Sequence, residues 1–150
     1  MKLIDYIGKL NCHEDYLKII NKLEQKSLYI EIVIISERES NELVDKLKED
    51  IIGIKKVSKW WGTSTALQNN LYKIKASKKL FEYLRQYETF CKYYTFDQLE
   101  EDGRTNIFCG DQVEYTDFGC DDIVFYDDKE LPLLYTTTHE GYIMIRDDLL

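Results

Sequence analysis

The sequence predicts an α+β protein in which helices cover one face of a mostly antiparallel sheet. Two observations support this prediction: apolar residues recur at helical spacing in three segments, and β-branched or alternating segments lie between them. The chain has 150 residues, 44% of them hydrophobic and 32% charged, which is typical of a folded domain. Twelve Tyr and six Phe argue against disorder, because disordered segments are poor in aromatic residues.

The first predicted helix spans residues 13–25. Its apolar residues recur every three or four positions and form one stripe, made by Tyr16, Leu17, Ile20 and Leu23. Lysine and glutamate occupy the opposite side, as on a helix that covers a core. Asn11 can act as the N-cap, and Glu14 follows it at capping-box spacing.

Two further helices are predicted by the same criteria. The second spans residues 39–50, with Ser36 and Glu39 at capping-box spacing and an inner stripe that includes Leu43 and Leu47. The third begins after Ser77 and runs to about residue 89. Its apolar face is formed by Leu80, Phe81, Leu84 and Tyr87.

The segments between the helices have the composition of strands. Residues 29–35 are β-branched and nearly all apolar, which predicts a central strand that is buried on both faces. Residues 54–61 and 71–76 show alternation along the chain, as half-buried strands do. The polar segment 62–70 is predicted to join them as a long hairpin loop.

The order of these elements is β-α-β-β-α, the beginning of a ferredoxin-like split βαβ arrangement that requires one more strand. Asp and Gly residues separate several short segments after the third helix, which suggests an antiparallel β meander. The candidate strands are residues 106–109, 112–115, 123–126, 133–137 and 142–146. We expect a single domain over residues 1–150; the alternative is an α/β half followed by a separate β half, with a boundary near residue 96.

Acidic residues are concentrated in the second part of the chain. Residues 97–130 hold twelve carboxylates and two cations, a net charge of −10, whereas the whole chain carries −8. Residues 1–96 hold 17 basic and 13 acidic residues, and residues 97–150 hold 3 basic and 15 acidic residues. A concentrated negative field can steer a basic partner toward one side of a protein.

Aromatic residues are interleaved with these carboxylates, and aromatic anchors with a charged rim are typical of protein interfaces. We therefore interpret the stretch as a surface that binds a basic protein. The alternative is a solvated rim that maintains solubility and blunts strand pairing. The candidate partner-binding residues are Asp111, Glu114, Tyr115, Asp117, Phe118, Asp121, Asp122, Tyr126, Asp127, Asp128 and Glu130, together with Trp60 and Trp61.

Signals for catalysis and metal binding are weak. Cys109 or Cys120 could pair with His139 in a small hydrolase or transferase, but nothing in their spacing brings them together. The cysteines and histidines lack the short spacing of a zinc site, and the sequence contains no phosphate-loop or esterase motif. We therefore expect no catalytic residue, no metal and no cofactor.

A further alternative is a module that binds single-stranded RNA or a small ligand. A basic sheet face with stacking aromatics is typical of single-strand binding, and lysines cluster around Trp60, Trp61 and Tyr72. These lysines are Lys55, Lys56, Lys59, Lys73, Lys75, Lys78 and Lys79. The sequence pI of about 4.8 argues against nucleic acid as the partner, because nucleic-acid modules are usually basic.

No segment has the length and hydropathy of a membrane span, and the first residues contain no apolar run of signal-peptide type. The four cysteines form no CxxC pair and are expected to be reduced thiols. These features predict a cytoplasmic protein that has no membrane partner.

In overall character the chain resembles bacterial immunity proteins, the cytosolic antidotes to polymorphic or contact-dependent growth-inhibition toxins. The resemblance lies in a small, acidic, aromatic-rich chain, in the segment VSKWWGT at residues 57–63, and in the acidic strands through Glu140 and Gly141. It implies a tight, reversible inhibitory complex with one cognate toxin, often a nuclease. It implies no particular functional residue, because no family motif is matched.

Overall fold

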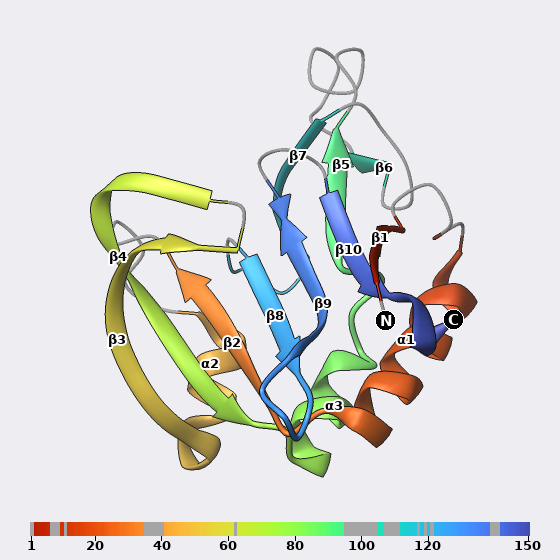
Figure 1. Ribbon diagram of the computed structural model, residues 1–150, viewed down its shortest axis with the longest axis horizontal. Helices are drawn as coiled ribbons and strands as arrows, with labels where there is room; N and C mark the ends of the chain where they lie inside the picture. The colour runs from red at the N-terminus through yellow and green to blue at the C-terminus, as the bar shows by residue number, and fades with distance from the viewer. Residues whose placement is uncertain are drawn as a thin grey trace.

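The apolar segment predicted as a central strand forms β2 (Tyr29–Ile34), an interior strand of a seven-stranded antiparallel sheet (Figure 1). The computed structural model describes residues 2–6, 10, 12–34, 41–61, 63–94, 105–106, 112–116, 118, 120, 122–138 and 142–150. In residues 91–94, 105–106 and 112–116 it describes the backbone alone.

The sheet has the strand order β1-β10-β9-β8-β2-β4-β3, and every neighbouring pair is antiparallel. Its other strands are β1 (Leu3–Asp5), β3 (Ile51–Trp60), β4 (Thr63–Lys75), β8 (Asp122–Tyr126), β9 (Pro132–Thr137) and β10 (Tyr142–Arg146). A smaller sheet at the top of Figure 1 contains β5 (Cys91–Tyr94), β6 (Thr105–Asn106) and β7 (Gln112–Thr116) in the order β6-β5-β7. The predicted α+β class with a mostly antiparallel sheet is confirmed.

The split βαβ arrangement is present between β2 and β8. Along the chain these elements are β2, α2 (Glu42–Lys46), β3, β4, α3 (Lys78–Leu84) and β8, and the four strands lie in the spatial order β8-β2-β4-β3. Because β2 and β3 are both antiparallel to β4, they are parallel to each other, as this arrangement requires. β9 and β10 continue from β8 as a meander, as predicted for residues 123–126, 133–137 and 142–146, so strands from both sides of residue 96 share one sheet. The other two segments predicted for this meander do not join it, because β6 and β7 pair with β5 in the smaller sheet.

The helices and the sheet share one core. Helix α1 (His13–Lys26) contributes Tyr16 and Leu23, which pack with residues of α2, α3 and alternate positions of the central strands. These partners include Leu43, Leu80, Phe81, Ile30, Ile32, Ile74, Ile123 and Phe125. Among the described residues, no helix is long and apolar enough to cross a membrane.

The ends of the helices differ from the predictions. Helix α1 begins after Cys12, which makes no side-chain cap bond, so the predicted Asn11 cap is wrong; Asn11 itself lies outside the described residues. Helix α2 begins at Glu42, because the Asn41 side chain accepts a hydrogen bond from the Val44 N–H at 3.0 Å. The predicted start at residue 39 is therefore wrong, and Ser36 and Glu39 lie outside the description.

The other boundaries of the second and third helices also differ. Residues Lys48–Asp50 form a separate 3₁₀ turn after α2. Helix α3 begins after Ser77 as predicted, with the Ser77 hydroxyl accepting from the Leu80 N–H at 3.1 Å, but it ends at Leu84. The apolar periodicity continues to Tyr87 because that side chain packs against Phe118 from a turn, at a centroid distance of 5.0 Å.

The predicted loop at residues 62–70 is wrong, because residues 63–70 belong to β4 and pair with β3. The polar side chains of this segment are satisfied within a bent hairpin: Asn69 donates to the Thr65 hydroxyl at 2.9 Å, and that hydroxyl lies 2.7 Å from the Leu67 carbonyl. A register shift between Val57 and Lys59 accommodates the bend. The polar residues of this segment therefore belong to a bulged, twisted β-ribbon and not to a loop.

The tip of the β3–β4 hairpin folds back toward β8 (Figure 1) and is held there by Asp122. The Asp122 carboxylate is 3% exposed and accepts hydrogen bonds from Trp60 Nε1 at 2.5 Å and Thr63 Oγ1 at 3.4 Å, both on the hairpin. From β9 and its end it accepts bonds from Thr136 Oγ1 at 3.0 Å and the Thr138 N–H at 2.8 Å. One buried carboxylate thus joins the hairpin tip to β8 and β9.

Replacing this carboxylate should weaken the whole fold. Asp122→Ala leaves several buried donors without an acceptor, and we expect it to reduce the free energy of unfolding by about 3 kcal/mol. Urea unfolding followed by far-UV circular dichroism measures the loss. The exposed neighbour gives a control, because Asp128→Ala should change stability by less than about 0.5 kcal/mol. Equal stability of the two variants would contradict the proposed role of Asp122.

Candidate functional site

The structure divides the predicted partner-binding residues into three groups. The first group has no described side chains. Asp111, Asp117 and Asp121 lie outside the described residues, and Glu114 and Tyr115 are described on β7 by backbone alone. Those with buried side chains are Phe118, Asp122, Tyr126 and Asp127. Those at least partly exposed are Trp60 and Trp61 at the hairpin tip and Asp128 and Glu130 in the β8–β9 turn.

Burial changes the interpretation of three of these residues. Phe118 packs edge-to-face on Phe90 in the main core, at a centroid distance of 6.1 Å. Asp122 and Asp127 use their oxygens for hydrogen bonds inside the protein. Their expected placement on a partner-facing surface was wrong, because counting charges along a sequence does not show which way a strand residue points.

The predicted pairing of Cys109 or Cys120 with His139 falls outside the described residues, because neither Cys109 nor His139 is among them. Cys120 is fully buried in the main core. Within the described residues, no group of His, Cys, Asp and Glu side chains has the geometry to hold a metal ion.

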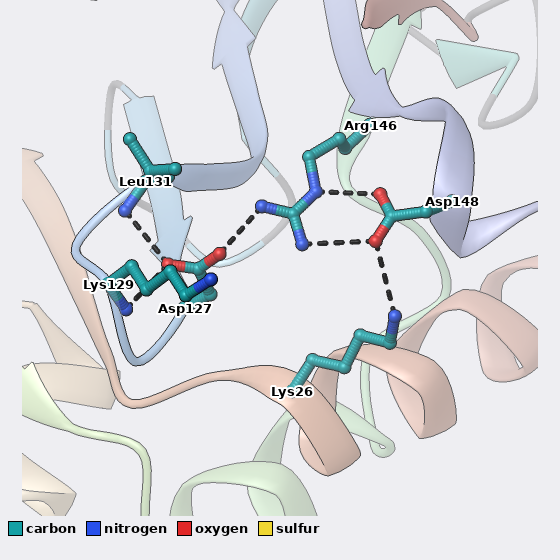
Figure 2. Close-up of polar contacts among 6 residues, drawn as sticks. All are labelled: Lys26, Asp127, Lys129, Leu131, Arg146 and Asp148. Atoms are coloured by element: carbon teal, nitrogen blue, oxygen red, sulfur yellow. Dashed lines mark hydrogen bonds and ion pairs between the residues drawn. The ribbon is translucent and has the colours of Figure 1, made fainter. Parts of the chain in front are cut away.

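An ion-pair cluster ties the C-terminal segment to the β8–β9 turn and to α1 (Figure 2). The Arg146 guanidinium donates to Asp127 Oδ2 at 2.7 Å and, through two nitrogens, to both Asp148 oxygens at 2.6 and 3.0 Å. Lys26 of α1 lies 3.2 Å from Asp148 Oδ2. The guanidinium is therefore held between two carboxylates, in the bidentate geometry that arginine forms best.

These contacts shift the pKa values of Asp127, Arg146 and Asp148. Hydrogen bonds, chiefly from Arg146, lower the pKa of Asp148 to about 2. Burial alone would raise the pKa of Asp127, but hydrogen bonds from Arg146 and from two backbone N–H groups outweigh it and lower the pKa. Hydrogen bonding to the carboxylates raises the pKa of Arg146. The ionised forms of all three groups are thus favoured in the folded protein.

The same cluster shapes the β8–β9 turn. Asp127 Oδ1 accepts from the N–H groups of Lys129 and Leu131, each at 2.9 Å, and the Asp127 N–H donates to the Leu131 carbonyl at 2.9 Å. Glu130 adopts a φ of 61°, in the left-handed region that L residues disfavour. The turn is closed at both ends, so its exposed side chains project from a fixed backbone.

We call the exposed part of this region the acidic corner, comprising Leu28, Asp128, Glu130, Leu131 and Asp148. Leu28 is 51% exposed and Leu131 is 50% exposed, which leaves apolar surface beside the carboxylates. Leu28, Asp128, Leu131 and Asp148 border a cavity of about 550 Å³. Of the predicted partner-binding residues, the corner contains Asp128 and Glu130; its apolar surface comes from two leucines and not from the predicted aromatic residues.

A second concave region, the hairpin groove, lies between the β3–β4 hairpin and β8. Two cavities of about 450 and 410 Å³ share Glu31, Lys55, Leu71 and Tyr126 as lining residues, so they are two ends of one groove. Trp61 borders the groove, donates from Nε1 to the Tyr126 hydroxyl at 2.6 Å, and stacks on Tyr135 at 5.2 Å. The groove contains lysines and aromatics from the cluster that the sequence suggested as a ligand face.

The Tyr126 hydroxyl connects the two walls of the groove. Burial is the main cause that raises its pKa, and the nearby Glu31 carboxylate adds to the effect, so the phenol is protonated across the physiological range. The phenol can then accept from Trp61 and donate to Glu31. At the other end of the groove Tyr29 stacks on Tyr126 at 4.8 Å, and the Lys73 ammonium lies 4.1 Å above the Tyr29 ring.

Sequence reasoning missed several of these residues. Arg146 was a detectable signal, because it is one of 3 cations among 15 carboxylates in residues 97–150, and an isolated cation there is expected to find acidic partners. Leu28 and Leu131 gave no signal, since a single leucine beside a strand usually faces a core. Glu31 gave a weak one, as the one charged residue in an apolar strand.

No known protein family, no curated protein and no solved structure matches this chain.

The pKa of Asp148 predicts an acid-sensitive contribution to stability. Because the folded-state pKa is lowered from 3.8 to about 2, the ion pair stabilises the protein fully above about pH 4 and loses its effect as the pH falls toward 2. We expect Asp148→Asn to cost about 1 kcal/mol at neutral pH and to lessen the fall in stability between about pH 5 and about pH 2.5. Asp147→Asn, an exposed neighbour, is the control for urea titrations at each pH. An Asp148→Asn profile parallel to that of the unmodified protein would refute the assignment.

Proposed function

We propose that this chain is a non-enzymatic protein-binding inhibitor of the immunity-protein type, and that the acidic corner forms part of its contact with a basic partner. The observation that supports this proposal is a turn of fixed geometry that presents exposed carboxylates beside exposed leucines. Apolar contact area with a charged rim supplies both affinity and steering in protein interfaces.

The backbone of Glu130 gives further support. A left-handed conformation costs an L residue roughly 1 kcal/mol relative to glycine, and a turn of this kind would ordinarily hold glycine. A charged residue stands here instead, and its carboxylate lies only 3.5 Å from the Tyr29 hydroxyl, a marginal hydrogen bond. A side chain held at a cost in stability, with little internal contact to offset it, is consistent with a role in binding.

The competing RNA-binding hypothesis receives less support from the geometry. Bases stack on exposed aromatic faces, but Tyr29 is 7% exposed and Tyr126 is 8% exposed. Both rings are engaged with each other, and Lys73 covers Tyr29. Trp61 retains the most accessible ring of this group, at 38% exposure.

The proposal is tested with the product of the neighbouring reading frame, since immunity proteins are encoded beside their toxins. Expression of that product in a bacterial host should arrest growth, and co-expression of this chain should restore it. The purified proteins should form a tight one-to-one complex whose association rate falls as salt rises. Growth that is unaffected by the neighbouring product, or arrest that this chain does not relieve, would refute the proposal.

Charge reversal tests whether the acidic corner is the interface. Asp128→Lys combined with Glu130→Lys should slow association with the basic partner by about tenfold or more at low salt. The control is Glu49→Lys combined with Glu82→Lys, an equal charge change at exposed positions on other elements. Stopped-flow or surface-plasmon measurements give the rates. Equal rates for the two double variants would exclude the corner, and reversal at Asp122 or Asp127 is unsuitable because both support the fold.

Two substitutions at Glu130 separate backbone strain from carboxylate chemistry. Glu130→Gly and Glu130→Ala both remove the carboxylate, but only glycine relieves the left-handed backbone. We expect Glu130→Gly to be more stable than Glu130→Ala by about 1 kcal/mol in urea unfolding, while both weaken partner binding to the same extent. Equal stabilities would show that the conformation at this position carries no cost.

A further inference from the structure

The hairpin groove has an excess of positive charge that the acidic corner lacks. Its lining includes Lys55, Lys59 and Lys73 against one carboxylate, Glu31. Lys73 lies directly opposite Glu31 across the β2–β4 pair and over the Tyr29 ring, so its charge is already partly engaged. Lys55 and Lys59 are exposed and form no ion pair with any residue in the described ranges.

The walls of the groove are apolar and aromatic. Trp61 is held in place by its hydrogen bond to Tyr126 and by stacking on Tyr135, yet more than a third of its surface is exposed. Val57 and Leu71 supply aliphatic surface nearby. A fixed indole with free surface favours a flat ring, because aromatic stacking requires no further ordering of the side chain.

Gly53 keeps one end of the groove open. A Cβ atom built on Gly53 would meet no heavy atom within 4 Å, and the residue has no positive φ. The position therefore tolerates a side chain both sterically and conformationally, and a large one would occupy the groove itself.

We propose that the hairpin groove binds a small aromatic anion, with the flat ring against Trp61 and the anionic group near Lys55 and Lys59. The cavity volumes of about 450 and 410 Å³ are within the range of small-molecule sites. Two unpaired ammonium groups beside a partly desolvated aromatic wall favour an anion with an apolar body over either a neutral ring or a free inorganic anion. The acidic corner meets the groove only at its Tyr29 end, where Glu130 lies, whereas the proposed ligand lies at the Trp61 end. The ligand is therefore proposed independently of the inhibitory function.

The test uses two probes that differ in one charged group: 8-anilinonaphthalene-1-sulfonate and neutral N-phenyl-1-naphthylamine. Fluorescence titration of the full chain should show one site for the sulfonate, with at least about tenfold higher affinity than for the neutral probe. Lys55→Glu combined with Lys59→Glu should remove that preference, while Lys78→Glu combined with Lys79→Glu, on exposed positions of α3, should leave it intact.

A second variant locates the probe. Val57→Trp should block binding of both probes by filling the end of the groove that Lys59 and Trp61 line, with an unchanged urea midpoint to show that the fold is intact. Three results would overturn the inference: equal affinities for the two probes, sulfonate binding that survives Val57→Trp, or the same loss of affinity in the Lys78/Lys79 control. The probe titrations contain no partner protein, so a negative result in them does not bear on the inhibitor proposal. A negative result in the toxin experiment likewise does not bear on the proposed ligand site in the groove.

Discussion

The position of the β3–β4 hairpin tip, which forms one wall of the hairpin groove, depends on the burial of one carboxylate. Asp122 accepts hydrogen bonds from the hairpin tip through Trp60 and from β9 through Thr136. Together with the bond from Trp61 to Tyr126 of β8, these contacts keep the 10-residue and 13-residue strands of the hairpin folded back over β8. The stacking of Trp61 and the enclosure of the groove both follow from this attachment. An ionisable group therefore acts here as part of the core, because neighbouring donors replace the water that it loses.

Charged residues of the acidic half fall into two populations with different physical roles. Asp122 and Asp127 face inward and are fully engaged, while Asp128 and Glu130 are carried on the same turn region and face solvent. The Arg146 guanidinium compensates the inward charge at Asp127, since a buried carboxylate without a cation or several donors would be costly. Through its bonds to the turn backbone, Asp127 fixes the positions of Asp128 and Glu130. The two exposed carboxylates therefore have a defined direction although they lie in a turn.

Most of the architecture was predictable because periodicity encodes burial. Helical spacing around Tyr16 and Leu23 and the apolar run of β2 gave the correct elements, and their order gave the correct split βαβ arrangement. The second half of the hairpin was mispredicted as a loop. Asn69 donates a hydrogen bond to the Thr65 hydroxyl across a bend, and polar composition alone does not reveal such a contact. For the candidate site, charge in the sequence indicated the acidic segment but not which of its carboxylates face solvent. Asp127 and Asp128 are adjacent in sequence and similar in kind, but Asp127 alone of the two bonds Arg146 and the turn N–H groups of Lys129 and Leu131.

The placement of the two tryptophans has a consequence for how this protein is observed. Both indoles of the chain lie at the tip of the β3–β4 hairpin, bonded to Asp122 and Tyr126, whereas the helical core is built from Leu, Ile, Phe and Tyr. Intrinsic emission excited at the indole band is therefore a local reporter of whether the hairpin is docked. Global unfolding is recorded by the backbone signal. A spectroscopic transition at the indoles that precedes the backbone transition would mark the hairpin as a separate cooperative unit, able to open while the sheet persists.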